Sequence, residues 1–302
     1  MTTPAIKTLI APADLSALME KGNTVIIDTR TPEEYAAGHI EGAVNVREIF
    51  SYLAESTPEG LSAMQSMFAD LLGKAGLGGA EHAVIYEDAM NNGYGQSCRG
   101  FFLLKYLGYD RVSILHGGLK VWTDAGLPLT TSASHPEAKP FPLAVRSELM
   151  LTTPEMLATL GDPNAVALDV RDFVEWTGES SSPYGVDFAP RKGRIPGAVL
   201  LEWYSLMDNS GDVPMFKPAG EIASMAAELG ITQGSEVNIY CFKGARASNA
   251  FVALTEAGFS NLRIYFASWN EWARDPSLPI ETGMPDPKRP AIAYQTPATV
   301  GA

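Results

Sequence analysis

Short apolar runs, each bounded by glycine or polar residues, alternate along the chain with longer stretches of helical periodicity. Runs of this length are typical of strands that are buried in a parallel sheet. The predicted strands cover residues 24–28, 83–86, 112–115, 165–169, 237–240 and 262–265. Gly108 and Gly258 are expected to end the helices that precede them, and Thr153 is expected to cap a helix that begins at Pro154. The alternation predicts an α/β fold with mainly parallel sheets flanked by helices.

The same series of motifs occurs twice along the chain. An Asp-Thr-Arg motif in the first half returns as Asp-Val-Arg, and a Gly-His-Ile-Glu-Gly-Ala block returns as Gly-Arg-Ile-Pro-Gly-Ala. The matching segments are 28–30 with 169–171, 38–43 with 193–198, and 108–122 with 258–272. These segments keep their order, and their offsets stay between 141 and 155 residues. Such a repeat predicts two copies of one α/β domain.

The repeat and the distribution of proline predict the domain boundaries. We expect an N-terminal domain over residues 1–130, a linker over 131–146, a C-terminal domain over 147–283 and an extended tail over 284–302. The linker and the tail are rich in proline and show no periodicity, which is typical of segments without helices or strands.

The composition excludes several classes of partner. The chain has 302 residues, of which 46% are hydrophobic and 19% charged, as expected for a soluble globular protein. Its 22 Lys and Arg against 35 Asp and Glu give a net charge of −13, which argues against nucleic acid or an anionic membrane surface as a general partner. No apolar run approaches the roughly 18 residues that a membrane helix needs.

The cysteines and histidines suggest neither a disulfide framework nor a metal site. The chain contains two cysteines, Cys98 and Cys241, and four histidines without metal-ligand spacing. We therefore expect no cofactor and no metal, and we expect Cys98 to be a structural residue of its helix. The N-terminus lacks the apolar stretch of a secretory signal, so a cytoplasmic location is expected. The chain is also expected to act as a monomer.

The two copies differ at one reactive position. Cys241 follows a predicted strand and precedes a helix, whereas the first copy carries Glu87 at this place. A cysteine there lies near the backbone N–H groups and the positive end of the helix dipole, which favour the thiolate. Lys243 and Arg246 add positive charge, and Gly244 lets the backbone curl around one atom. Cys241 is thus predicted to be a nucleophile, and the alternative is a buried core cysteine.

The length of this loop restricts the chemistry. Cysteine phosphatases place five residues between cysteine and arginine around a tetrahedral phosphate, and here only residues 242–245 intervene between Cys241 and Arg246. The shorter loop suits a smaller transferred group, such as a single sulfur atom. It argues against a phosphatase or an arsenate reductase.

From about Leu9 to Glu281 the chain resembles the rhodanese family, and in particular its tandem two-domain sulfurtransferases. The repeated motifs, the six-residue loop from Cys241 to Arg246 and the closing Trp122 and Trp272 carry this resemblance. The resemblance implies an inactive N-terminal domain, with Glu87 in place of cysteine. It also implies that Cys241 takes a sulfur from a donor as a persulfide and passes it to cyanide or to a thiol such as glutathione or thioredoxin. The amides of Phe242, Lys243, Gly244, Ala245 and Arg246 would stabilise the negative sulfur.

The resemblance leaves two donors open. Lys243 stands where members that use thiosulfate typically carry a basic residue, so thiosulfate is the favoured donor. The alternative donor is 3-mercaptopyruvate, whose carboxylate would be held by Arg171 and Arg191, although Glu175 stands where a further basic residue is expected. Trp203 is predicted either to line the cleft or to belong to the core. A third possibility is a persulfide carrier or a sulfur-sensing partner protein with little turnover of its own.

Overall fold

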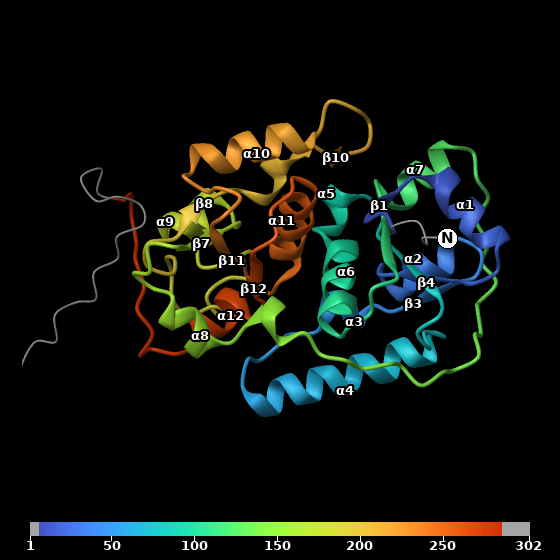
Figure 1. Ribbon diagram of the computed structural model, residues 1–302, viewed down its shortest axis with the longest axis horizontal. Helices are drawn as coiled ribbons and strands as arrows, with labels where there is room; N and C mark the ends of the chain where they lie inside the picture. The colour runs from blue at the N-terminus through green and yellow to red at the C-terminus, as the bar shows by residue number, and fades with distance from the viewer. Residues whose placement is uncertain (1–5, 286–302) are drawn as a thin grey trace, which may run out of the picture. The chain divides into compact units, whose positions relative to one another are not determined.

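The computed structural model describes residues 6–285, so residues 1–5 and 286–302 lie outside the description (Figure 1). The chain divides into two units. Unit 1 contains the chain up to Ala54 together with Pro58–Ser147 and Met207–Lys217, and unit 2 contains Glu55–Thr57, Glu148–Leu206 and the chain from Pro218. In the described part of the chain, each unit is built around one five-stranded sheet.

The sheet of unit 1 has the strand order β1-β5-β4-β2-β3, and all neighbouring pairs are parallel. Its strands are β1 (Leu9–Ile10), β2 (Thr24–Asp28), β3 (Ala43–Asn45), β4 (His82–Tyr86) and β5 (Val112–Leu115). The helices are α1 (Pro12–Glu20), α2 (Pro32–Ala37), α3 (Glu48–Ser51), α4 (Pro58–Lys74), α5 (Met90–Gly93), α6 (Gln96–Tyr106) and α7 (Gly118–Asp124). The central strand β4 buries all five of its side chains, which explains its almost unbroken apolar sequence.

Unit 2 repeats this topology with the strand order β6-β12-β11-β7-β8, again with parallel pairs throughout. Its strands are β6 (Met150–Leu151), β7 (Ala165–Asp169), β8 (Val199–Leu200), β11 (Glu236–Tyr240) and β12 (Leu262–Tyr265). Its helices are α8 (Thr153–Ala158), α9 (Phe173–Thr177), α10 (Ala219–Glu228), α11 (Ala245–Glu256) and α12 (Ser268–Trp272), and η2 (Trp203–Leu206) is a short 3-10 helix. Tyr240, Tyr265, Trp269 and Trp272 belong to one buried core cluster.

A short antiparallel hairpin belongs to unit 1 although it follows η2 in sequence. It is formed by β9 (Met207–Asp208) and β10 (Met215–Phe216). The ring of Phe216 stacks on His116 with centroids 5.6 Å apart, and the Phe216 N–H donates to His116 Nε2 at 2.9 Å. Burial lowers the pKa of His116 to about 4, so the ring is a neutral acceptor for this hydrogen bond.

The predicted α/β architecture is confirmed. Four predicted strands have the observed bounds, and β4 and β11 each begin one residue earlier than predicted. The helix cap was predicted wrongly, since Thr152 rather than Thr153 is the N-cap of α8, and its side chain accepts from the Glu155 N–H. Residues 131–146 form no helix or strand. The predicted tail lies outside the described residues from 286 onward. No helix within residues 6–285 is long and apolar enough to cross a membrane.

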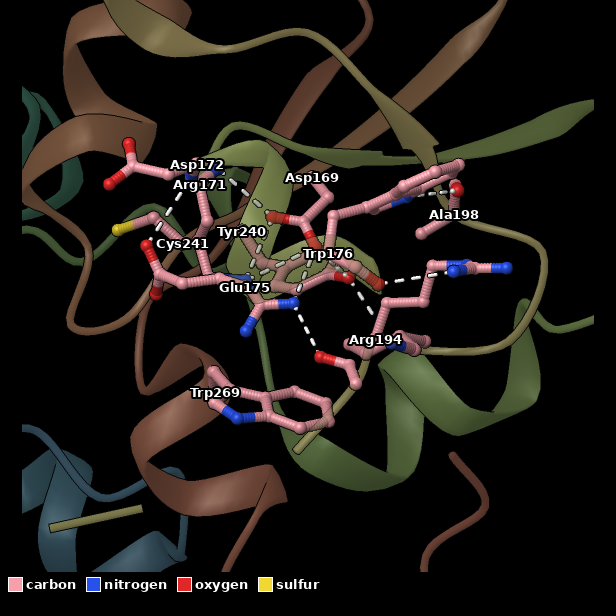
Figure 2. A network of polar contacts seen from close by, with 12 residues as sticks. Asp169, Arg171, Asp172, Glu175, Trp176, Arg194, Ala198, Tyr240, Cys241 and Trp269 are labelled. Atoms are coloured by element: carbon pink, nitrogen blue, oxygen red, sulfur yellow. Dashed lines mark hydrogen bonds and ion pairs between the residues drawn. The ribbon is translucent and has the colours of Figure 1, made fainter. Parts of the chain in front are cut away.

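A buried network of one aspartate, one arginine and one tyrosine ties the ends of β7 and β11 together (Figure 2). The Tyr240 hydroxyl donates to Asp169 at 2.6 Å and accepts from the Ile195 N–H at 3.1 Å. Arg171 donates to Asp169 at 2.6 Å and to the Gly193 carbonyl at 2.8 Å. Asp169 therefore has a structural role at the ends of these two strands.

Unit 1 contains the same network at the ends of β2 and β4. The Tyr86 hydroxyl donates to Asp28 at 2.5 Å and accepts from the Ile40 N–H at 3.3 Å. Arg30 donates to Asp28 at 2.6 Å and to the Gly38 carbonyl at 2.7 Å. The Asp-x-Arg motifs detected in the sequence thus fix the same pair of strands in both copies.

We expect Tyr240→Phe to lower the free energy of unfolding by about 1–3 kcal/mol, because the buried Ile195 N–H loses its acceptor and Asp169 loses a donor. Urea-induced unfolding measures this change. Tyr204→Phe alters a tyrosine that is 43% exposed and serves as the control. Equal stability of both variants and the wild type would show that the network contributes nothing.

Candidate active site

The cysteine singled out by the sequence lies between β11 and α11. Cys241 directly follows the last residue of β11 and is 1% exposed. The Gly244 N–H donates to Cys241 Sγ at 3.1 Å. Gly244 is the N-cap of α11 and has a φ of +90°, and a Cβ at this position would lie 2.7 Å from the ring of Phe266. Only glycine fits this turn without strain, and the turn aims a backbone N–H at the sulfur.

The backbone of the loop is held by the N-terminus of α12. The Cys241 N–H donates to Ser268 Oγ at 3.2 Å. In return, the Trp269 N–H donates to the Cys241 carbonyl and the Asn270 N–H to the Phe242 carbonyl, both at 3.0 Å. The carbonyls of Cys241 and Phe242 and the Cys241 N–H are therefore all engaged by α12, which fixes the start of the loop.

Arg246 forms a buried ion pair that the sequence did not predict. Its guanidinium donates to Glu175 at 2.7 and 3.1 Å, and its Nη1 lies 3.4 Å from Asp172. Burial opposes the charged form of Arg246, but the charges of Glu175, Cys241 and Asp172 outweigh it and hold the pKa of Arg246 above its ordinary value. The acidic Glu175, which stood where a basic residue was expected, is thus the partner of a loop arginine. The positive charge of Arg246 is balanced inside the protein.

Lys243 and Phe242 both contact a residue that the sequence did not single out. The Tyr184 ring lies 5.0 Å from the Phe242 ring between centroids, and Lys243 Nζ lies 5.4 Å from the Tyr184 centroid. Tyr184 belongs to an insertion of the second copy, in which the segment from Asp169 to Gly193 is 14 residues longer than the segment from Asp28 to Gly38 in the first copy. The sequence shows this insertion, but its spacing from the loop gives no sign of the contact. Ala245, the first residue of α11, is buried.

Both arginines that the sequence suggested for carboxylate binding form contacts with other groups of the protein. Arg171 is fully buried against Asp169, with its Cζ 4.6 Å from the Trp269 centroid (Figure 2). Arg191 donates to backbone carbonyls, among them those of Leu278 at 2.7 Å and Ala273 at 3.1 Å. These contacts hold the loops around α12, and they give no support to the expectation that either side chain holds a substrate carboxylate.

Trp203 is a buried residue of η2. Trp203 is 5% exposed, and its backbone N–H donates to the Val170 carbonyl. Its ring packs edge to face on the Tyr204 ring, with centroids 6.2 Å apart. Of the two interpretations left open by the sequence, this burial favours a core position.

Unit 1 holds a carboxylate where unit 2 holds the sulfur. Glu87 is fully buried and accepts hydrogen bonds from the N–H of Gln96 at 3.0 Å, the N–H of Ser97 at 3.3 Å and the Ser97 hydroxyl at 2.6 Å. Burial raises the pKa of Glu87 to about 7, although these hydrogen bonds oppose the shift. A Cβ on Gly93 would lie 1.7 Å from the Glu87 carboxylate, so the longer loop of unit 1 is shaped around this side chain.

The other cysteine is enclosed beside this carboxylate. Cys98 is fully buried in α6, and burial and the charge of Glu87 both raise the pKa of its thiol. A raised pKa disfavours the thiolate, which fits the structural role expected for Cys98. Among the residues that the structure describes, no group of three or more His, Cys, Asp and Glu side chains could hold a metal ion.

The chain contains two α/β domains, each built on a parallel sheet. One has a cysteine in its strand-to-helix loop and the other a carboxylate, and together they define a tandem-repeat class of protein. The rhodanese-like domain matches residues 11–125 and again 152–275, and the chain belongs to this family.

Relatives match nearly the full length of the chain. It is 30% identical over 273 residues to the thiosulfate sulfurtransferase of Azotobacter vinelandii, and the matched region covers 90% of this chain and 96% of the relative. It is also 30% identical over 290 residues to a probable 3-mercaptopyruvate sulfurtransferase of Pseudomonas aeruginosa, with 91% and 98% covered. The sulfur carrier protein TtuD of Thermus thermophilus is 28% identical, with 82% and 87% covered.

A solved structure shows the same fold. The wild-type structure of EanB matches with a TM-score of 0.79 at 24% identity, covering 92% of this chain and 70% of that chain. At this level of identity the likeness concerns the fold alone.

The ion pair of Arg246 predicts a large cost for removing its partner. In Glu175→Gln the buried guanidinium loses a charge at 2.7 Å, and we expect the free energy of unfolding to fall by about 3–5 kcal/mol. Urea-induced unfolding measures the loss, with Glu179→Gln, at an exposed position, as the control. Adding Arg246→Met to Glu175→Gln removes the buried guanidinium that has lost its main partner and is expected to restore part of the stability. If Glu175→Gln behaves like its control, the pair is not stabilising.

The raised pKa of Glu87 predicts a dependence of stability on pH. The native carboxyl keeps its proton up to about pH 7, whereas a solvated glutamate loses it near 4.5, so the native state binds more protons between these values. Stability therefore falls as the pH rises through this window. Relative to Glu87→Gln, we expect the wild type to lose about 2 kcal/mol of unfolding free energy between about pH 5 and about pH 8. Urea unfolding at several pH values measures this, and a constant difference would contradict it.

Proposed function

We propose that the protein is a sulfurtransferase that moves a sulfane sulfur from thiosulfate to a thiophilic acceptor through a persulfide on Cys241. The observation that carries the proposal is the position of Cys241 Sγ, which accepts the Gly244 N–H at the start of α11 in a chain of the rhodanese family. The relatives from Azotobacter vinelandii and Pseudomonas aeruginosa that are named thiosulfate sulfurtransferases support the same reaction.

The reaction consists of two displacements at sulfur. The thiolate of Cys241 attacks the outer sulfur of thiosulfate, the S–S bond of the donor breaks, and sulfite leaves with the bonding electron pair. The acceptor then attacks the terminal sulfur of the persulfide, and the Cys241 thiolate departs. Cyanide becomes thiocyanate, and a thiolate becomes a persulfide. The sulfur carries negative charge before and after each displacement, and the N–H groups of residues 242–246 are fixed dipoles that stabilise it.

We assign this chemistry to the C-terminal domain, residues 147–283, and propose that the N-terminal domain, residues 1–130, is inactive. The support is the exchange of Cys241 for Glu87, because a buried carboxylate is neither a soft nucleophile nor a good carrier of sulfur. The linker over 131–146 joins the two domains.

Thiosulfate is the proposed donor because it is a dianion and the loop carries Lys243. The alternative is 3-mercaptopyruvate, which the relative from Pseudomonas aeruginosa supports by its name. A carrier with little turnover of its own is the second alternative, and the sulfur carrier from Thermus thermophilus supports it. Glutathione, thioredoxin and cyanide are the proposed acceptors, and we propose a monomer in the cytoplasm, where both cysteines stay reduced.

The proposal is tested by intact-mass measurement after brief exposure of the reduced protein to thiosulfate or to 3-mercaptopyruvate. We expect one sulfur atom to be added to the wild type, mapped to Cys241 and removed by cyanide, and we expect thiosulfate to load faster. Cys241→Ser should add no sulfur and show no transfer, whereas Cys98→Ser, which removes the buried cysteine of α6, should keep both.

The outcomes separate the alternatives. Faster loading by 3-mercaptopyruvate would exchange the donor, and loading without steady-state turnover would make the protein a carrier. Sulfur transfer that persists in Cys241→Ser would overturn the assignment of the nucleophile.

A further inference from the structure

The second copy contains a segment that the first copy lacks, and this segment contacts the Cys241 loop. From Asp169 to Gly193 there are 24 residue steps, whereas the corresponding distance in the first copy, from Asp28 to Gly38, is 10. Residues 178–192 contain no helix or strand. Since the segment has no counterpart in the inactive copy, it is a place where residues specific to the reacting site are expected.

A tight turn fixes the position of Tyr184 within this segment. The Tyr184 N–H donates to Ser182 Oγ at 3.2 Å, and the Gly185 N–H donates to the Ser182 carbonyl at 3.2 Å. Ser182 is 4% exposed and anchors the turn in the protein, while Tyr184 is 45% exposed. The turn therefore presents an aromatic ring from a rigid base to the protein surface.

The ring of Tyr184 packs on the loop beside the cysteine. Its centroid lies 5.0 Å from that of Phe242, which is 3% exposed and is the residue next to Cys241. The Phe188 ring lies 5.7 Å from the Tyr184 ring between centroids. The geometry of both pairs is tilted, with interplanar angles of 42° and 52°, as is favourable for aromatic side chains. Tyr184 thus joins the insertion to the loop.

The same ring attracts the ammonium group of the loop. Lys243 Nζ lies 5.4 Å from the Tyr184 centroid, within the range of a cation–π interaction. The lysine side chain is long and flexible, so fixing its head group costs rotamer entropy, and an aromatic face offsets this cost. Tyr184 is thus one contact of this ammonium group.

We propose that Tyr184 is a positioning residue that orders the Lys243 ammonium on the Cys241 loop for a dianionic sulfur donor, so that the insertion contributes to donor preference. The inference rests on the proposed function. A positioned cation attracts a dianion such as thiosulfate more strongly than a monoanion such as 3-mercaptopyruvate. Because this attraction acts before the sulfur moves, its loss weakens binding and leaves the chemical step intact.

The test compares Tyr184→Leu, which keeps an apolar contact with Phe242, with Tyr184→Phe, which keeps an aromatic face for Lys243. We expect Tyr184→Leu to raise the KM for thiosulfate about two- to fivefold at unchanged kcat, with a smaller rise for 3-mercaptopyruvate. Tyr184→Phe should behave like the wild type. Phe188→Leu, which removes the neighbouring ring, is the matched control and should leave the KM unchanged. Equal effects of all three variants would overturn the proposal.

A second measurement does not depend on sulfur transfer. The rates at which iodoacetate and the uncharged iodoacetamide alkylate Cys241, mapped by peptide mass, report how strongly an anion is attracted to the loop. We expect the ratio of the two rates to fall about two- to fivefold in Tyr184→Leu and to stay constant in Tyr184→Phe. An unchanged ratio and KM in Tyr184→Leu would overturn this inference. A wild type that transfers no sulfur, but whose ratio falls in Tyr184→Leu, would instead overturn the proposed function.

Discussion

The hydrogen bond between the hydroxyl of Tyr240 and the carboxylate of Asp169 determines where the reactive loop begins. Tyr240 is the last residue of β11 and Cys241 is the next residue, so whatever fixes the end of this strand also fixes the cysteine. Asp169 is charged and fully buried, which is tolerated because Arg171 pairs with it and Tyr240 donates to it. Arg171, which the sequence suggested as a ligand of the substrate carboxylate, is therefore required to stabilise the fold. In the proposed reaction, substrate binding therefore depends on groups of the loop and its surroundings.

The two units show how one strand-to-helix junction can hold either a sulfur or a carboxylate. In unit 2 the Gly244 N–H at the start of a helix donates to Cys241 Sγ, and in unit 1 the N–H groups of Gln96 and Ser97 at the start of a helix donate to Glu87. A carboxylate is longer than a thiol and has two oxygens to satisfy. The loop of unit 1 is longer by four residues and carries Gly93 where a side chain would collide with Glu87. The side chain of Glu87 accepts hydrogen bonds from backbone N–H groups of its own loop. These N–H groups are therefore already engaged by a side chain of the protein.

The sequence predicted the central strands and the repeat, because buried strands of four or five residues leave an apolar run that can be read without tertiary information. It missed the two-residue edge strands such as β1 and β6, which are defined by pairing with β5 and β12 and not by a pattern of their own. It placed Arg246 beside the cysteine as a free cation, because Glu175 lies 71 residues away in the chain and nothing in the spacing pairs them. The contact of Tyr184 with Lys243 was hidden for the same reason.

The acidity of the whole protein limits how an anionic donor can be attracted to the site. A chain with a net charge of −13 repels anions at long range, so an anionic donor must be attracted by groups within a few ångströms of the sulfur. The charge of Arg246 is balanced by Glu175, and its ion pair mainly braces α11 against α9. Backbone dipoles stabilise the sulfur but carry no net charge. Lys243 is the loop cation that we propose attracts the donor, and the Tyr184 ring lies 5.4 Å from its ammonium group.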